Sequence, residues 1–299
     1  VGNKVAFSDQ EQSNVWAPAA TNQAGSFTLA TNGNLMAGVR MRGETLLLTD
    51  MDAHTARYQG PPFVYGFRQA GTGCGVISAN GCAVADGTAY WMGNNGFYSY
   101  NGSVQSMRSS VGDFIFSHLN TTERSKVFAV VNSQFSEVVW FYPSAGTTEN
   151  DSYVSYNYRE NHWQIGKVAR TAGFDIGAFV FPNYTSADGY VYEHEVGNAY
   201  DTDSDVFAET GPMQIGVGDR MMVATSLIPD EQTQGDVTAT FKTRTYPNSA
   251  ESSFGPFDMA NPTSVRFQGR QVQMRVTGDQ PTSWRVGNMR LEVVAGSRR

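Results

Sequence analysis

Four histidines are the first residues to consider for chemistry, and their contexts argue against a catalytic centre. They are His54, His118, His162 and His194. His194 lies between Glu193 and Glu195, but no second histidine follows at helical spacing, so the zinc-protease pattern is absent. A lone histidine in a strand or turn is ordinarily structural or exposed. We therefore expect no catalytic residue and no metal ligand among the four.

Two further motifs lack residues that their chemistry requires. No Gly-x-Ser-x-Gly elbow occurs, so a hydrolase nucleophile has no motif support. The segment Gly71–Gly75 (GTGCG) has the glycines of a phosphate loop, but neither its lysine nor a following helix. We interpret this segment as an ordinary loop and expect no cofactor.

Three alternating aspartates, Asp201, Asp203 and Asp205, resemble the start of a calcium loop. An EF-hand loop needs glycine at its sixth position and a bidentate glutamate at its twelfth. This chain has Val206 and Pro212 at those positions, so the EF-hand hypothesis fails. A solvated acidic turn is the favoured interpretation, and a looser Ca²⁺ site in a β loop is the alternative.

Carbohydrate chemistry is a further alternative. Sialidase-like propellers carry the box Ser-x-Asp-x-Gly-x-x-Trp, but the nearest match, Val84–Trp91, lacks the serine and has glycine directly after Asp86. Glycoside hydrolysis also needs two carboxyl groups about 5–10 Å apart, which linear sequence does not reveal. Because the aromatic side chains that might stack on sugars mostly alternate, about half should face the core, and we favour a structural role for them. They are Tyr90, Trp91, Tyr98, Tyr100, Tyr153, Tyr156 and Tyr158.

The two cysteines, Cys74 and Cys82, lie in one glycine-rich segment. A disulfide across a hairpin is geometrically feasible, but two cysteines in 299 residues form no disulfide framework. We expect buried, unpaired thiols.

Composition indicates a packed, turn-rich β protein. Charged residues make up 16% of the chain, which also contains 31 Gly, 14 Tyr and 18 Phe. The net charge is −7, but residues 1–211 carry 11 Lys/Arg against 20 Asp/Glu, and residues 212–299 carry 10 against 8. An acidic body argues against tight binding of nucleic-acid phosphates, which needs clustered cations. It is compatible with a channel through which DNA slides.

Three stretches share a pattern in which aromatic alternation is coupled to tight polar turns. They are Asp86–Gly102, Val138–Trp163 and Asp188–Tyr200. Alternation is the period of a strand with one buried face, and the Asn-Gly, Asp-Gly and Gly-Asn turns accept the positive φ of tight hairpins. One such unit per roughly 40–50 residues is the spacing of propeller blades. We predict an all-β fold with a propeller-like body.

Other segments complete the expected organisation. The apolar spacing in Ser110–Lys126 predicts one short helix, capped at Ser109 or Ser110. The proline pair in Arg57–Arg68 predicts a loop between two units of the body. After a boundary near residue 211, five predicted strands indicate a β-sandwich-like module. These strands are Arg220–Ile228, Val237–Tyr246, Ser264–Phe267, Gln271–Thr277 and Arg290–Val294. We therefore expect a propeller-like domain at 1–211, incomplete or truncated at its N-terminus, and a sandwich-like module at 212–299.

Arginine outnumbers lysine 17 to 4, and many arginines fall late in the chain. Arginine forms forked, weakly hydrated contacts suited to protein–protein interfaces. We therefore expect subunit contacts there, made by Arg266, Arg270, Arg275, Arg285, Arg290, Arg298 and Arg299.

The ends of the chain and its apolar runs bear on processing and membranes. No apolar run approaches the ~18–20 residues needed to span a bilayer, so no membrane span is predicted. The chain opens at Val1 without methionine and without a basic-then-apolar leader. We expect either a processed start or a fragment of a longer protein.

Several segments carry a resemblance to a known family. Cys82–Val104 (which contains ADGTAYWMGNNGFYSYNG), followed by SVGDFIFSHLN, resembles the tail nozzle or tail stabilisation proteins of short-tailed double-stranded DNA bacteriophages. Tyr156–Gly166, Ser186–Gly197 and the ending Val265–Arg299 are similar to the same family. The resemblance covers roughly residues 40–299, and its motifs are patterns rather than catalytic signatures.

The resemblance implies a structural virion protein of the phage tail with no catalytic residues. Its propeller-containing subunits would form a homo-oligomeric ring, usually a hexamer, below the portal and its adaptor and next to tail fibres or spikes. That ring would continue the DNA channel and help retain the genome until ejection, with double-stranded DNA passing through without sequence-specific binding. The alternative function is a carbohydrate-binding or carbohydrate-processing propeller for host adhesion. A third is an extracellular adhesion domain of a cell-surface protein.

Overall fold

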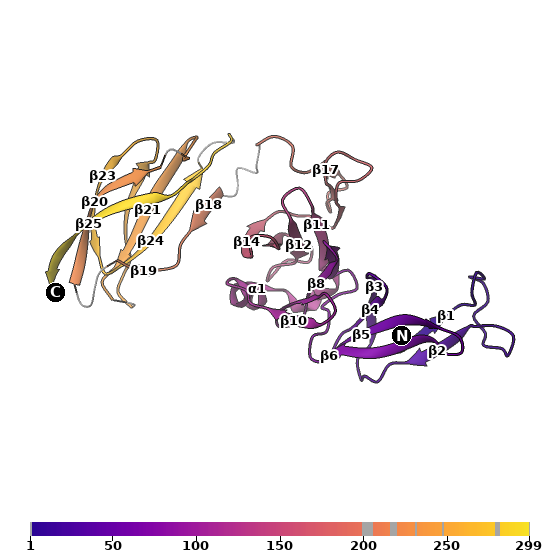
Figure 1. The fold of residues 1–299 in the computed structure, drawn as a ribbon. Helices are drawn as coiled ribbons and strands as arrows, with labels where there is room; N and C mark the ends of the chain where they lie inside the picture. Colours follow the sequence, from indigo (N-terminus) through magenta and orange to yellow (C-terminus); the bar gives the residue numbers. More distant parts are fainter. Residues whose placement is uncertain are drawn as a thin grey trace. The chain divides into compact units, whose positions relative to one another are not determined.

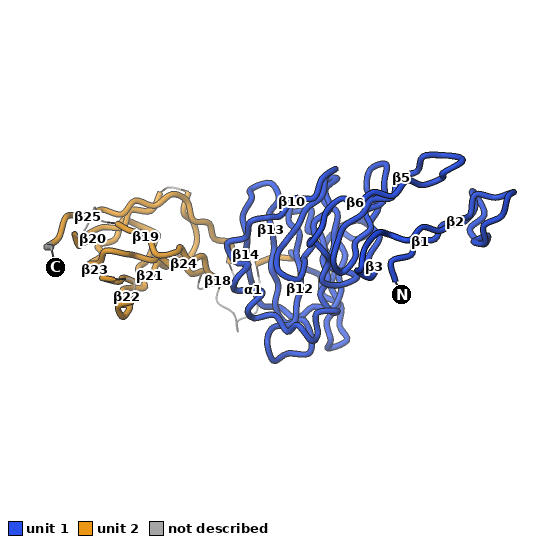
Figure 2. Tube along the Cα trace, turned by 90° about the horizontal axis from the view of Figure 1, so that it is seen from below, with its two compact units in different colours: residues 1–195 blue, residues 196–299 orange. Residues whose placement is uncertain are grey.

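A computed structural model describes residues 2–198, 206–215, 220–230, 232–246, 248–278 and 282–298. In these residues the chain forms antiparallel β-sheets with only two short helical segments, and it divides into compact units at 1–195 and 196–299 (Figures 1 and 2). The all-β fold predicted from composition and alternation is confirmed.

Four sheets in chain order, together with a two-stranded sheet of β1 (Lys4–Phe7) and β2 (Gly25–Thr28), build the first unit (Figure 1). The first contains β3 (Leu35–Arg40), β4 (Thr45–Thr49), β5 (Ala53–Gly60) and β6 (Val64–Gly71). The second contains β7 (Cys82–Ala85), β8 (Thr88–Met92), β9 (Phe97–Tyr100) and β10 (Val104–Met107). The third contains β11 (Phe128–Asn132), β12 (Glu137–Tyr142), β13 (Ser152–Asn157) and β14 (His162–Lys167). The fourth has three strands, β15 (Ala172–Phe174), β16 (Asn183–Thr185) and β17 (Val191–Glu193).

These sheets are arranged like successive propeller blades. Within each sheet every strand pairs with the next strand along the chain. The first strands of neighbouring sheets also lie next to one another, β3 beside β7, β7 beside β11 and β11 beside β15. First strands that gather while later strands diverge are the mark of radially repeated sheets. A hairpin of β1 (Lys4–Phe7) and β2 (Gly25–Thr28) covers the outer face of the first sheet, where Phe27 stacks on Phe67 with ring centroids 4.4 Å apart.

A tight turn closes the first hairpin of the second sheet, as its dipeptide predicts. Asp86 and Gly87 join β7 to β8 with φ angles of 48° and 76°. Two consecutive positive φ angles define the two-residue hairpin turn whose twist matches that of the strands. The Asp-Gly turn therefore joins β7 to β8 in the register that pairs Ala85 with Thr88 and Cys82 with Trp91.

The largest core of the first unit lies between the second and third sheets. Trp140 is fully buried there, and its ring contacts Phe97 with centroids 5.1 Å apart. The Trp140 indole Nε1 donates a hydrogen bond of 3.1 Å to the carbonyl oxygen of Gly81, so its one polar atom is satisfied. Ile115 packs into the same core from the helix that follows β10.

The predicted helix over Ser110–Lys126 is two shorter segments. The α-helix α1 (Gly112–His118) ends at the extended residue Leu119, and a 3₁₀ helix, η1 (Thr121–Lys126), follows. The break occurs because Asn120 leaves the helical pattern. Its side chain accepts a hydrogen bond from Thr122 N, and its own backbone N–H donates to the carbonyl oxygen of Pro143. No serine side chain caps α1 by a helix-capping hydrogen bond, so the predicted serine cap is also wrong.

The proline pair Pro61–Pro62 was interpreted as a loop between two units, and this interpretation is wrong. These prolines lie in the turn between β5 and β6, which pair with each other inside the first sheet. Proline is excluded from the middle of a strand, but it fits a hairpin end where no ladder hydrogen bond is needed. The local inference of a turn was sound, whereas its placement between units was not.

The second unit is a two-layered β-sandwich (Figure 1). One sheet contains β18 (Val206–Glu209), β19 (Met213–Gln214), β24 (Gln271–Gly278), β21 (Val237–Arg244) and β22 (Ser252–Asp258). The other contains β23 (Thr263–Gly269), β20 (Arg220–Pro229) and β25 (Met289–Arg298). Phe241 of the first sheet stacks on Phe267 of the second with centroids 4.6 Å apart, which joins the layers in one core.

The second unit begins earlier than residue 212. β18 pairs antiparallel with β24 over four residues, from Val206 opposite Gly278 to Glu209 opposite Arg275. A boundary at residue 211 would separate this strand from its sheet. The compact units therefore divide between residues 195 and 196.

Candidate functional site

The four histidines lie in four unrelated settings. His54 is buried in β5, His118 ends α1, His162 begins β14, and His194 follows β17. Arg170 Nε donates a 2.7 Å hydrogen bond to His194 Nε2, and burial together with Arg170 lowers the pKa of His194 to about 4. Burial also lowers the pKa of His54. Among the described residues no group of three or more His, Cys, Asp or Glu is placed to hold a metal ion.

Of the remaining polar candidates, the two cysteines pack in one core of the first and second sheets. Asp201, Asp203 and Asp205 lie outside the described residues. Cys74 and Cys82 are both free thiols; Cys74 is buried, and burial raises the pKa of the Cys82 thiol to about 12.

The late arginines divide into paired and exposed side chains. Arg275 lies over the Phe207 ring at 3.7 Å and contacts Glu209, and Arg270 lies over the Tyr246 ring at 4.8 Å. Arg285 donates to Gln232 Oε1. Arg266 and Arg290 are exposed on the outer face of the β23–β20–β25 sheet, since each alternates with core residues. Arg299 and the Arg298 side chain lie outside the described part of the chain.

The aromatic residues of the second and third sheets lie in different settings: Tyr98 stacks on Trp91 beside one core, and Tyr153 packs against Phe141 beside another. Trp91 and Tyr100 are buried core residues, as alternation predicts for part of the set. Tyr90, Tyr156 and Tyr158 are half-buried and form a separate cluster, with ring centroids about 6 Å from Tyr90 to each of the others. This cluster borders a cleft that no sequence motif indicates.

The cleft runs between the outer strands of the second and third sheets and has a volume of about 640 Å³. Its lining combines three aromatic rings with hydroxyl, amide and imidazole groups. The lining residues are Thr88, Tyr90, Ser99, Asn101, Gln105, Ser106, Met107, Arg108, Ser110, Tyr156, Asn161, His162 and Trp163. Arg108 is the only Lys, Arg, Asp or Glu among them.

Hydrogen bonds hold the aromatic side of this cleft in place. Trp163 Nε1 donates to the carbonyl oxygen of Arg108 at 3.0 Å, which ties β14 to the end of β10. Tyr156 OH and Asn161 Oδ1 are 3.0 Å apart, and the Tyr156 and Trp163 rings are in contact with centroids 4.7 Å apart. The aromatic wall is therefore preorganised by contacts within the protein.

Two carboxyl groups form a second polar cluster, where the third and fourth sheets meet. Gln164 Nε2 donates to Glu137 Oε1 at 2.6 Å, and Asn132 Nδ2 donates to Glu195 Oε1 at 2.9 Å. Burial raises the pKa of Glu137 to about 7, and repulsion from Glu195 adds to this effect. Desolvation of the carboxyl group also raises the pKa of Glu195, although the residue as a whole is exposed. Amide donors hold both carboxyl groups in place, and negative charge on the pair is unfavourable at neutral pH.

Replacing Glu137 with glutamine is expected to stabilise the protein at pH 8 by about 1 kcal/mol, after allowance for partial solvent screening. The folded-state pKa of about 7 exceeds the ordinary value of 4.5, so the folded state binds this proton more tightly. The contribution of Glu137 is therefore favourable below pH 4.5 and is lost as the pH rises through 7. Glutamine keeps the oxygen that accepts from Gln164, so only the charge is removed.

The measurement is urea unfolding of wild type and variant from pH 4.5 to pH 8.5. Burial of neutral His194 acts in the opposite sense, because it costs stability as the pH falls below 6.5. The difference in unfolding free energy between wild type and variant reports the effect of Glu137 alone, and this difference should grow with rising pH. Glu193→Gln, at an exposed carboxylate on β17, is the matched control. A Glu137→Gln difference that is constant with pH would contradict this prediction.

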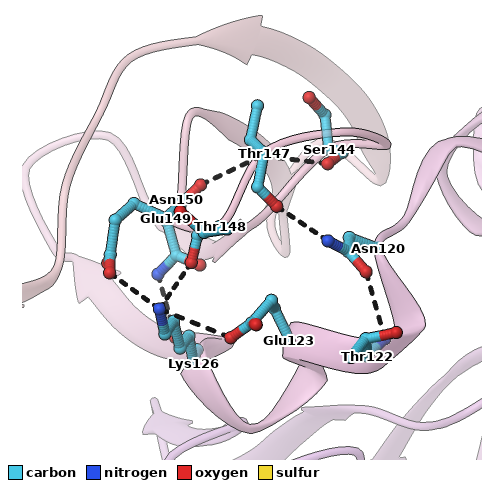
Figure 3. A network of polar contacts seen from close by, with 9 residues as sticks. All are labelled: Asn120, Thr122, Glu123, Lys126, Ser144, Thr147, Thr148, Glu149 and Asn150. Carbon is cyan, nitrogen blue, oxygen red and sulfur yellow. Dashed lines mark hydrogen bonds and ion pairs between the residues drawn. The ribbon is translucent and has the colours of Figure 1, made fainter.

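A third polar cluster surrounds Lys126 and is structural (Figure 3). Lys126 Nζ lies 2.7 Å from Glu149 and 3.4 Å from Glu123, and it also donates to the carbonyl oxygen of Thr148. Asn120 Nδ2 donates to the carbonyl oxygen of Thr147 at 2.7 Å. These contacts fasten the loop between β12 and β13 onto η1, and they neutralise the lysine.

The fourth sheet has one buried and one exposed face. Tyr184 of β16 packs against Phe141 of the third sheet, with centroids 5.5 Å apart. On the other face Phe174 is 49% exposed and Val191 is 65% exposed. The loop after β15 adds Ile176, Phe179 and Val180, which are also exposed, and Phe179 contacts the Phe174 ring. We call Phe174, Ile176, Phe179, Val180 and Val191 the outer apolar face.

Comparisons with known proteins identify no family. No family model matches the chain, and no curated protein matches it. Among solved structures, the Saccharomyces cerevisiae core factor aligns at 10% identity and a TM-score of 0.36 over 92% of this chain, which spans about half (51%) of that one. An exo-beta-1,3-galactanase from Phanerochaete chrysosporium aligns at 9% identity and a TM-score of 0.29, over 82% of this chain and 77% of that one. A glycoside hydrolase aligns at 10% identity and 0.28, over 83% and 82%. Likenesses at these scores carry no argument about function.

Nothing long and apolar enough to cross a bilayer occurs among the helices of the described residues.

Proposed function

We propose that this protein is a structural virion protein, a subunit of a phage tail nozzle ring that acts by assembly rather than by catalysis. In this proposal the ring continues the DNA channel below the portal and adaptor and helps retain and deliver the genome. The family resemblance of Cys82–Val104 and the later segments motivates the proposal. The outer apolar face of the fourth sheet is the observation that carries it.

The outer apolar face has the composition of a surface that contacts another protein. Val180 is 81% exposed, and its loop also exposes Ile176 and Phe179; the Phe179 ring contacts Phe174 of β15. Contiguous exposed apolar surface on a soluble protein marks an interaction site. Within the first unit, aromatic and β-branched side chains of neighbouring sheets meet in three cores, so this face offers the same kinds of side chain that pack between blades.

A second copy of this chain is the occupant that we propose for the outer apolar face. The first sheet already has its outer face covered by the β1–β2 hairpin, so the fourth sheet of one copy would meet a different surface of the next. Contacts between two different surfaces are the kind that close into rings. Arg266 and Arg290 offer a second, charged surface for an acidic neighbouring subunit.

The test is the mass of the purified full chain across a concentration series, measured by light scattering after size exclusion. The expected result is a closed ring, a hexamer by the family resemblance, whose fraction rises with concentration. The double variant Arg266→Glu and Arg290→Glu is expected to lower the ring fraction at 0.15 M salt. Cryo-electron microscopy of the assembled species would show whether the rings enclose a channel. A monomer, or a closed dimer, at all concentrations would contradict the proposal.

A further inference from the structure

The cleft between the second and third sheets has the features of a ligand site independent of assembly. We propose that it binds a saccharide that carries a carboxylate. Its volume of about 640 Å³ lies within the ~300–1,000 Å³ range typical of small-molecule sites. The lining residues come from two blades, so a ligand there would be held between preformed walls.

Half-buried aromatic rings form one wall of the cleft. Tyr90, Tyr156 and Trp163 line it, and contacts with one another and with Phe97 fix their positions. A ring that is held rigidly offers a flat apolar surface at little entropic cost. The apolar face of a pyranose ring fits such a surface. Neutral hydroxyls on the other side of the sugar then need hydrogen-bonding partners.

Side-chain amides and hydroxyls supply those partners. Asn101 and Gln105 are exposed on the second sheet, and Asn161 is exposed on the third. Amides offer both a donor and an acceptor, which suits sugar hydroxyls. In addition, β10 and β14 are the edge strands of their sheets, so one row of backbone groups on each points away from its own sheet.

The single positive charge in the cleft lining favours an acidic sugar over a neutral one. Arg108 is the only Lys, Arg, Asp or Glu in the lining, and its guanidinium is exposed. The neighbouring His162 lies 3.4 Å from Glu160, which is outside the lining. A single arginine in a lining that contains no Asp or Glu favours a carboxylate through a forked, charge-assisted contact. One cation also disfavours nucleic acid, which needs several.

Calorimetric titration of the full chain with tetragalacturonic acid tests this proposal, with maltotetraose as the neutral probe of equal length. We expect tetragalacturonic acid to bind and Arg108→Gln to weaken its binding about tenfold or more. Asn101→Asp replaces an amide with a negative charge and should weaken binding of tetragalacturonic acid more than any binding of maltotetraose. The change suits the local turn, because Asp and Asn both favour turns and the positive φ angle falls on Gly102.

Arg57→Gln is the matched control, since Arg57 is exposed on β5 of the first sheet and outside the cleft lining. It should bind tetragalacturonic acid as wild type does. The proposal is overturned if tetragalacturonic acid fails to bind at millimolar concentration. It is equally overturned if maltotetraose binds as tightly, or if Arg57→Gln and Arg108→Gln lose the same affinity. Unchanged unfolding midpoints of both surface variants show that a loss of binding is local.

Discussion

Replacing Trp140 with alanine is expected to destabilise the first unit by about 3–5 kcal/mol, a large part of the stability of a typical domain. Trp140 is fully buried between the second and third sheets and contacts the rings of Phe97 and Trp163. Removing it leaves a cavity between two rigid sheets, which have little freedom to collapse. The carbonyl oxygen of Gly81 also loses its indole donor, which adds the cost of an unsatisfied buried group.

Hydrogen exchange of the full chain followed by mass spectrometry measures this effect unit by unit. Peptides from β7 to β14 should lose protection in Trp140→Ala, whereas peptides from β20 to β25 should keep it, because the second unit has its own core. Trp16→Ala is the control, since Trp16 is 54% exposed and its loss opens no cavity. Equal loss of protection in both units would show that the chain unfolds as one body, contrary to the separate cores described above.

The strands and turns of the blades could be predicted from the sequence because each depends on residues that are close together in the chain. Asp86 and Gly87 adopt the positive φ angles that their types predict, and Trp91 and Tyr100 lie in the core as alternation indicates. The predicted strands of the second unit correspond to β20, β21, β23, β24 and β25. β22 was missed, because Gly255 and Pro256 interrupt the alternation that would have indicated a strand.

Sequence-based predictions were wrong where a long-range contact selected one of two locally favourable structures. The spacing of Phe114, Ile115 and Leu119 favours one helix, but Asn120 bonds to Pro143 and ends it. The proline pair indicates a turn in either of two places, and only the pairing of β5 with β6 assigns it to a hairpin. Propensity is a weak predictor wherever long-range partners compete with it.

Neither polar site was accessible from the sequence. The cleft combines Asn101 of one blade with Asn161 of the next, and the carboxyl pair combines Glu137 with a residue after β17. No fixed spacing relates residues that meet across sheets, so a motif search has nothing to match. The tyrosines were recognised in the sequence, but their division between core and cleft depends on which sheet faces which.

Self-association is expected to be lost when the outer apolar face receives charge. The double variant Val180→Glu and Val191→Glu should weaken association by about 100-fold, or ~2.7 kcal/mol, because two carboxylates would be desolvated in the contact between copies. Both valines are highly exposed in the single chain, so its own stability should change by less than about 0.5 kcal/mol. The ring fraction at a fixed concentration, measured by light scattering, reports the effect.

A single added charge elsewhere, compared with the single variant Val191→Glu, distinguishes the effect of this surface from the effect of net charge. Met51→Glu is suitable, since Met51 is 50% exposed in the first unit and outside the outer apolar face. If Met51→Glu disrupts association as strongly as a single Val191→Glu change, repulsion between acidic bodies is the cause and the fourth sheet is not the contact. If only the valine variants dissociate, the exposed face of the last blade is buried in the assembly. The copies would then contact one another by packing of one sheet on another, as neighbouring sheets do within each copy.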